Sequence, residues 1–117
     1  MENAIPFSNS DSLIQTRVQE TINFTPGKTI KAAAFWHAKS YTQGETDTVV
    51  PHTYTDYDLR LNTTSDLRIA TSITAANIER IVFDNNSYVT LVLKLTQASA
   101  RGEYTGFDWG AVTWVYE

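Results

Sequence analysis

The clearest pattern of hydrophobic and polar positions runs from Asp56 to Asn62. Its even-numbered positions hold Asp, Asp, Arg and Asn, and its odd-numbered positions hold Tyr, Leu and Leu. Successive side chains of a strand point to opposite faces of the sheet, so a period of two is typical of a half-buried strand. The pattern predicts a strand whose apolar face packs on a core and whose polar face carries two carboxylates.

The rest of the chain shows similar short patterns, separated by turn-forming residues. Strands are expected over 15–24, 29–38, 56–62, 67–71, 78–83, 87–96 and 104–116. Segment 29–38 is nearly continuously apolar, as in a central strand covered on both faces, although its three consecutive alanines also suit a helix. The Thr-Pro-Gly-Lys sequence at 25–28 and the Asp-Asn-Asn sequence at 84–86 predict turns. We therefore predict an all-β fold, an antiparallel β-sandwich or jelly roll of seven to nine strands.

A length of 117 residues suits a single domain with its own core. Residues 1–14 are polar, which predicts a linker or an artificial chain boundary, with room for a short edge strand. The sandwich is expected over residues 15–117, with a long polar loop at 39–55. Its core is expected to contain these residues: Val18, Ile22, Phe24, Ala34, Trp36, Leu59, Leu61, Ile69, Ile81, Phe83, Leu91, Leu93 and Trp114.

The composition of the chain limits its partners. Nine Lys and Arg stand against thirteen Asp and Glu, which gives a net charge of −4. Phosphate binding needs clustered cations, and the nine here are scattered along the sequence, so neither nucleic acid nor a membrane surface is expected as a partner. No apolar run approaches the roughly 20 residues of a membrane-spanning helix. The chain has no cysteine, which excludes disulfides, thiolate metal sites and cysteine nucleophiles.

The chain offers no set of residues for covalent or acid–base catalysis. Its only histidines are His37, in an apolar strand, and His52, in the long loop, and no Gly-x-Ser-x-Gly sequence is present. Asp56 and Asp58 are too close in sequence to stand on either side of a sugar, as the two carboxylates of a glycosidase do. We therefore expect no catalytic residue in this segment.

Calcium binding is the chemistry that the acidic residues fit best. Ca²⁺ takes six to eight hard oxygen ligands. Asp56 and Asp58 share one strand face, and Asp47 lies in the long loop before them. Asn77 or Glu79 would supply further oxygens. The sequence therefore predicts a calcium site that ties the 39–55 loop to the sheet.

The alternative interpretation of the acidic strand is ion pairing with arginine. Arg60, Arg68 and Arg80 lie in or next to the same group of strands. Exposed cross-strand pairs of this kind contribute less than about 1 kcal/mol each. Calcium would leave such pairs unchanged, so the two interpretations differ in a measurable way.

The aromatic residues supply one candidate ligand-binding side chain. Most tryptophans of a β-sandwich belong to its core, and we assign Trp36 and Trp114 there. Trp109 lies between Gly106 and Gly110 in the last strand. It is the tryptophan expected to be exposed, where it would stack against a sugar.

The order of several short motifs resembles a known domain family. These motifs are Phe24–Trp36 with its Pro-Gly turn, Asp56-Tyr-Asp-Leu59, Asn77-Ile-Glu79 before an apolar strand, Tyr88–Val92, and a terminal strand containing Trp114. Together they resemble the pre-peptidase C-terminal-like β-sandwich that follows the catalytic domain of secreted subtilisin-like serine peptidases. The chain departs from that family at Asn86-Ser87, where the family usually has Gly before the Tyr, and at Gly106 and Gly110.

The resemblance implies a non-catalytic accessory domain. Its partner would be the catalytic domain of the same chain, its location secreted or at the cell surface, and its role stability, substrate capture or surface attachment. Some domains of this type bind calcium near the loop around the Asp-x-Asp strand, here Asp56 to Asp58. The alternative function is a carbohydrate- or glycan-binding module. In either case, a protein or glycan substrate is the expected external partner.

Overall fold

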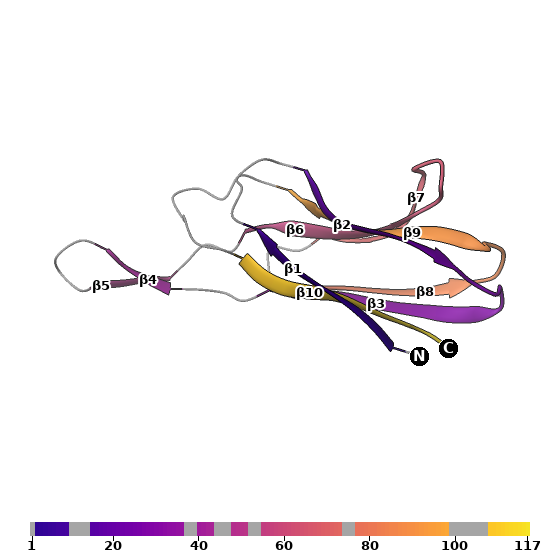
Figure 1. Cartoon of the computed structure of the whole chain (residues 1–117), viewed down its shortest axis with the longest axis horizontal. Coiled ribbons are helices and arrows are strands. Elements are labelled where there is room, and N and C mark those ends of the chain that lie inside the picture. The colour runs from indigo at the N-terminus through magenta and orange to yellow at the C-terminus, as the bar shows by residue number, and fades with distance from the viewer. Residues whose placement is uncertain are drawn as a thin grey trace.

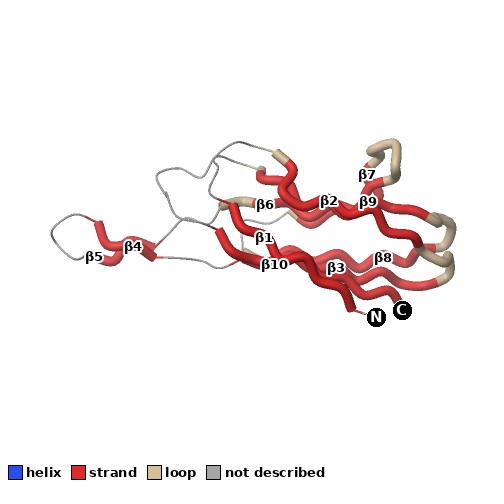
Figure 2. Tube along the Cα trace, in the orientation of Figure 1, coloured by secondary structure: helices blue, strands red, loops and turns tan. Residues whose placement is uncertain are grey.

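The computed structural model describes residues 2–9, 15–36, 40–43, 48–51, 55–73, 77–98 and 108–117. Within these ranges the chain forms two four-stranded antiparallel sheets that face each other, and no helix (Figure 1, Figure 2). The first, called the β3 sheet, has the order β1 (Glu2–Asn9), β10 (Asp108–Tyr116), β3 (Lys28–Trp36), β8 (Ile78–Asn85). The second, called the β6 sheet, has the order β2 (Thr16–Asn23), β9 (Thr90–Gln97), β6 (Tyr57–Asn62), β7 (Arg68–Ser72). The predicted β-sandwich of seven to nine strands is confirmed.

Two further strands lie outside the sandwich. The short strands β4 (Ser40–Gln43) and β5 (Thr48–Pro51) pair only with each other, and this hairpin projects beyond one end of the two sheets (Figure 1). The segment predicted as a long loop therefore contains a hairpin. No helix long and apolar enough to cross a membrane occurs among the described residues.

The N-terminal residues form a complete edge strand. Strand β1 pairs antiparallel with β10 along its whole length, from Glu2 opposite Val115 to Asn9 opposite Asp108. Ile5 and Phe7 of β1 pack against the core. The sandwich therefore includes residues that the sequence analysis set apart as a linker, and the short edge strand expected there is eight residues long.

The core lies between the two sheets and is built from alternate positions of the strands. Nine of the thirteen predicted core residues are buried, and the other four, Ile22, Ile69, Phe83 and Trp114, are partly buried and packed against them. The core also contains residues that the prediction left out: Ile30, Ala32, Tyr57, Leu95 and Val112. This agreement follows from the period of two, which places every second side chain between the sheets.

Two strands differ from the sequence-based expectation in which faces are covered. Strand β3 was expected to be covered on both faces, but its outer face is open and Phe35 is 46% exposed. A sheet in a two-layer sandwich packs on one side only, so a central strand still has an exposed face. Strand β6 shows the opposite difference, because Asp58 and Asn62 on its polar side are each only 5% exposed. Most of the expected polar face of β6 is therefore buried.

Candidate metal centre

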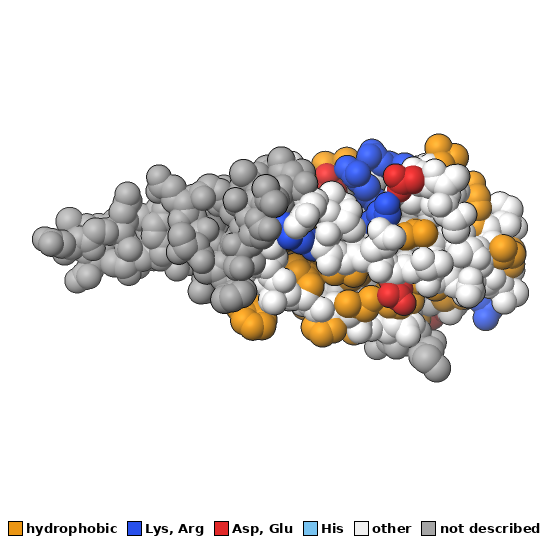
Figure 3. Space-filling view, turned by 45° about the horizontal axis from the view of Figure 1, so that its top comes forward, with side chains coloured by type: hydrophobic (Ala, Val, Ile, Leu, Met, Phe, Trp, Pro, Cys, Tyr) orange, Lys and Arg blue, Asp and Glu red, His pale blue; other side chains and the backbone are white. Residues whose placement is uncertain are grey.

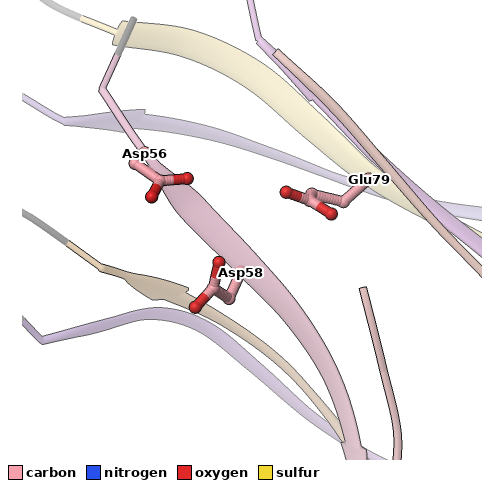
Figure 4. A group of neighbouring side chains, drawn as sticks. All are labelled: Asp56, Asp58 and Glu79. Atoms are coloured by element: carbon pink, nitrogen blue, oxygen red, sulfur yellow. The ribbon is translucent and has the colours of Figure 1, made fainter. Parts of the chain in front are cut away.

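Three carboxylates meet where strand β6 of one sheet approaches strand β8 of the other. Asp56 lies just before β6 and Asp58 lies within it, whereas Glu79 belongs to β8 of the opposite sheet. One carboxylate oxygen of each residue lies within 4.8 Å of those of the other two. In Figure 4 the carboxylates of Asp56 and Glu79 point toward each other, with Asp58 beside them on the same strand as Asp56. The cluster thus links the β6 sheet to the β3 sheet.

The pairing of the strands fixes these positions. Asp58 lies opposite Thr96 of β9, and the amide of Ala98 donates a hydrogen bond of 2.7 Å to the carbonyl of Asp56. Glu79 occupies a buried, core-facing position of β8. The hydroxyl of Ser72, at the end of β7, donates to a carboxylate oxygen of Glu79. Strand ends from both sheets therefore hold the cluster on rigid backbone.

Burial makes this cluster electrostatically unfavourable unless something neutralises it. Asp58 is 5% exposed and Glu79 1% exposed. Within the described part of the chain, Oδ1 of Asp56 and Oδ1 of Asp58 are buried without a hydrogen-bond partner. Removing carboxylates from water without partners costs several kcal/mol or forces protonation.

The ionisation of Asp56 reflects the same conflict. Burial, and then the negative charge of Asp58, raise the pKa of Asp56 above its ordinary value. The nearest described cation is Arg60, whose Nη2 lies 3.7 Å from Oδ2 of Asp58. This contact balances the charge of Asp58 only in part, so the buried oxygens of Asp56 and Asp58 that lack described hydrogen-bond partners favour a further cation.

The geometry suits a calcium ion. Calcium binds oxygen at about 2.3–2.6 Å, so two ligands on opposite sides of one ion lie about 5 Å apart. The oxygens of the cluster, all within 4.8 Å of one another, can therefore reach a common ion. Three carboxylates offer up to six oxygens, and the cluster found among the described residues contains no nitrogen or sulfur ligand. This set of hard oxygen donors fits Ca²⁺ and does not resemble a zinc or copper site.

The residues predicted as calcium ligands differ in where the structure places them. The structure brings Asp56 and Asp58 together with Glu79, which the sequence analysis named as a further candidate, whereas Asp47 lies outside the described residues. Asn77, the other candidate, uses its Nδ2 to donate to the carbonyl of Trp36 at 2.7 Å. The arginine interpretation is represented by Arg60, which approaches Asp58 along the same strand. Both histidines of the chain also lie outside the described residues.

Trp109, the candidate ligand-binding aromatic residue, does not belong to this cluster. It is 59% exposed on the outer face of the β3 sheet. Phe35 of the neighbouring strand, 46% exposed, lies on the same face, opposite Ala111, which is two residues from Trp109. The metal cluster and the aromatic pair are therefore two separate candidate sites.

Comparison with known proteins does not assign this chain to a family. No protein-family model matches it, and no curated protein matches it in sequence.

Proposed function

We propose that this chain is a non-catalytic, calcium-binding β-sandwich module that serves as an accessory domain of a secreted or cell-surface subtilisin-like peptidase. The observation that carries the calcium part is the convergence of Asp56, Asp58 and Glu79 from two sheets, with two buried carboxylate oxygens that lack hydrogen-bond partners among the described residues. A bound calcium would neutralise the cluster and hold the two sheets together where β6 approaches β8. Extracellular modules bind calcium with dissociation constants of about 10⁻⁴–10⁻³ M, which suits a secreted location.

Calcium is expected to raise the thermal midpoint of unfolding. A ligand that binds only the folded state, at a hundredfold excess over its dissociation constant, adds about 2.7 kcal/mol to the free energy of unfolding. For a chain of this size that corresponds to a rise on the order of 10 °C. Circular dichroism melts in excess EDTA and in excess calcium measure the difference. Asp58→Asn should lose the rise, because one of the three carboxylates is removed.

The matched control is Asp84→Asn. Asp84 lies on β8, outside the cluster, and is exposed, where it accepts a hydrogen bond from Thr29 at 2.7 Å. This variant should keep the full effect of calcium. Equal midpoints of the wild-type chain in EDTA and in calcium would reject the site.

The effect of calcium is expected to depend on pH. In the calcium-free protein the raised pKa of Asp56 means that the folded state holds this proton more readily than the unfolded chain. Asp56 therefore favours folding most below its unfolded pKa of 3.8, and this contribution is lost as the pH rises through its higher folded pKa. Calcium competes with the proton, so its stabilising effect should be large at pH 7 and should shrink as the pH falls toward 4.

The accessory role is supported by the motif resemblance and by the absence of a catalytic set in the sequence. The protein sequence encoded next to this segment, in the same reading frame, tests the accessory role directly. A subtilisin-like catalytic domain encoded in the same frame supports the proposal, and a glycoside hydrolase there would favour the second candidate. Peptidase turnover by the isolated chain would contradict the non-catalytic part.

A carbohydrate-binding module is the second candidate, and exposed Trp109 with Phe35 beside it is the observation that favours it. Aromatic faces stack on the apolar face of sugar rings, so Trp109→Ala is expected to weaken oligosaccharide binding about tenfold, equivalent to ~1.4 kcal/mol. Titration calorimetry against neutral oligosaccharides measures the loss. Val89→Ala, which trims another exposed apolar side chain away from this pair, is the control. Equal affinities of wild type and Trp109→Ala would exclude Trp109 as a stacking residue.

A further inference from the structure

A polar groove crosses the outer face of the β6 sheet, on the opposite side of the sandwich from Trp109. Its cavity has a volume of about 450 Å³. Its lining consists of three cations (Arg60, Arg68 and Lys94), Asp66, Asn62 and two threonines, Thr16 and Thr96. In Figure 3, Lys and Arg side chains gather in one blue cluster on this side of the molecule. We call this feature the cationic groove.

Two cations of this groove lie close enough to repel each other. Arg60 of β6 lies directly opposite Lys94 of β9. Like charges at directly opposed positions of neighbouring strands are destabilising. Each has an acidic neighbour: Asp66 lies 2.7 Å from Lys94, and Asp58 lies 3.7 Å from Arg60. Arg60 lines the groove and its Nη2 lies 3.7 Å from Asp58, so it reaches both the groove and the carboxylate cluster.

Asp66 is itself held in an unusual backbone conformation. Its φ is 69°, in the left-handed region of backbone conformation that residues other than glycine rarely adopt. There its carboxylate accepts hydrogen bonds from Lys94 at 2.7 Å and Asn62 at 3.0 Å. These contacts lower the pKa of Asp66 and fix the side of the groove next to Lys94. Arg60 and Arg68 supply the positive charge on its other side.

The lining indicates the chemistry of a ligand. Three cations, two hydroxyls, an amide and the carboxylate of Asp66, which is paired with Lys94, line the groove, and no apolar side chain is among its lining residues. An acidic peptide would bring apolar side chains and backbone that find no complementary surface here. The anionic oxygens and hydroxyls of a sugar chain that carries carboxylate or sulfate groups match the cations, hydroxyls and amide of this lining. Three cations are also too few for the repeated phosphate contacts of nucleic acid.

We propose that the cationic groove binds the carboxylate or sulfate groups of an acidic polysaccharide, and that calcium strengthens this binding through Arg60. When calcium takes the charge of Asp58, Arg60 loses its acidic neighbour and its charge becomes available to a ligand anion. Coupling between two sites is reciprocal, so the anion must also strengthen calcium binding by the same factor. The calcium dependence rests on the metal site proposed above, whereas the anion site itself does not.

The test measures binding of four probes by titration calorimetry: a polygalacturonate oligomer, dextran sulfate, neutral dextran and poly-glutamate. We expect binding of at least one anionic probe, no binding of the neutral probe, and an affinity that falls as salt is added. The polygalacturonate and dextran sulfate arms distinguish carboxylate from sulfate recognition. Binding of neutral dextran at equal strength would overturn the proposal, as would tighter binding of poly-glutamate than of either acidic polysaccharide.

Substitutions locate the site. Arg68→Gln and Lys94→Gln should each weaken the anionic probe about tenfold, since each removes a charged hydrogen-bond donor. Arg80→Gln is the matched control, because Arg80 is exposed on the other sheet, and it should leave the affinity unchanged. Loss of affinity in Arg80→Gln with none in Arg68→Gln and Lys94→Gln would place the anion site elsewhere and overturn the assignment.

The calcium link is tested by comparing anion affinity in calcium and in EDTA. Calcium should raise it about fivefold or more in the wild type and not at all in Arg60→Gln, which should bind calcium at least as tightly as the wild type. If calcium binds but neither anion does, the groove proposal is wrong and the metal site stands. If an anion binds but calcium does not, the metal site and its link to the groove are wrong. Equal anion affinities with and without bound calcium would rule out the proposal that Arg60 couples calcium binding to anion binding.

Discussion

Gly110→Ala is expected to lower the free energy of unfolding by about 3 kcal/mol or more, or to prevent folding, because the added methyl group has no space. A Cβ at this position would lie 2.1 Å from the carbonyl oxygen of Phe35, and 2.9 Å from both Cα of Trp36 and Cε1 of Phe7. Two of these three atoms belong to the backbone of the paired strand β3. A flexible side chain can move aside, but this backbone moves only if β10 separates from β3.

Urea denaturation followed by tryptophan fluorescence measures this loss, and Gly27→Ala provides the comparison. Gly27 has φ of 101°, and nothing lies within 4 Å of an added Cβ there. That substitution meets only conformational strain and should cost about 1–2 kcal/mol. If Gly27→Ala destabilises the chain more than Gly110→Ala, the close approach of β10 to β3 is incorrect.

Tyr57→Phe is expected to cost about 2–3 kcal/mol, because it removes the central hydroxyl of a buried polar network. This hydroxyl donates to Oδ2 of Asp108 at 2.6 Å and accepts from Nδ2 of Asn9 at 2.9 Å. Asn9 also donates to Oε1 of Gln97 at 3.0 Å. All four residues are buried and come from β1, β6, β9 and β10, so the network joins the two sheets.

The size of this effect follows from an asymmetry of hydrogen bonding. A single hydrogen bond contributes about 1 kcal/mol net, but a buried group that loses its partner also carries its full desolvation cost. Asp108 is 2% exposed, so bulk water does not replace the hydrogen bond that its Oδ2 accepts from the Tyr57 hydroxyl. The control is Tyr88→Phe, which removes a hydroxyl from a half-buried ring packed on Phe83, outside this network. Similar losses for the two variants would show that the network adds little stability.

The alternation of polar and apolar residues was enough to predict the fold class and most of the core. A period of two fixes which side of a strand each residue occupies, whatever the strand pairs with, so positions such as Leu59, Leu61 and Leu93 could be assigned without knowing the topology. The same reasoning placed Asp56 and Asp58 on one side of a strand. Calcium binding by these residues stays a prediction, which the melts in EDTA and in calcium test.

The tertiary structure decided how residues distant in sequence combine. Glu79 reaches Asp56 and Asp58 because β8 and β6 belong to different sheets and approach each other, a relation that no local pattern encodes. Strand pairing likewise brings Arg60, Arg68 and Lys94 into one groove, although the cations are scattered along the chain. Periodicity reports the face of a residue, whereas sheet order and register determine its neighbours, and these depend on the packing of the whole chain.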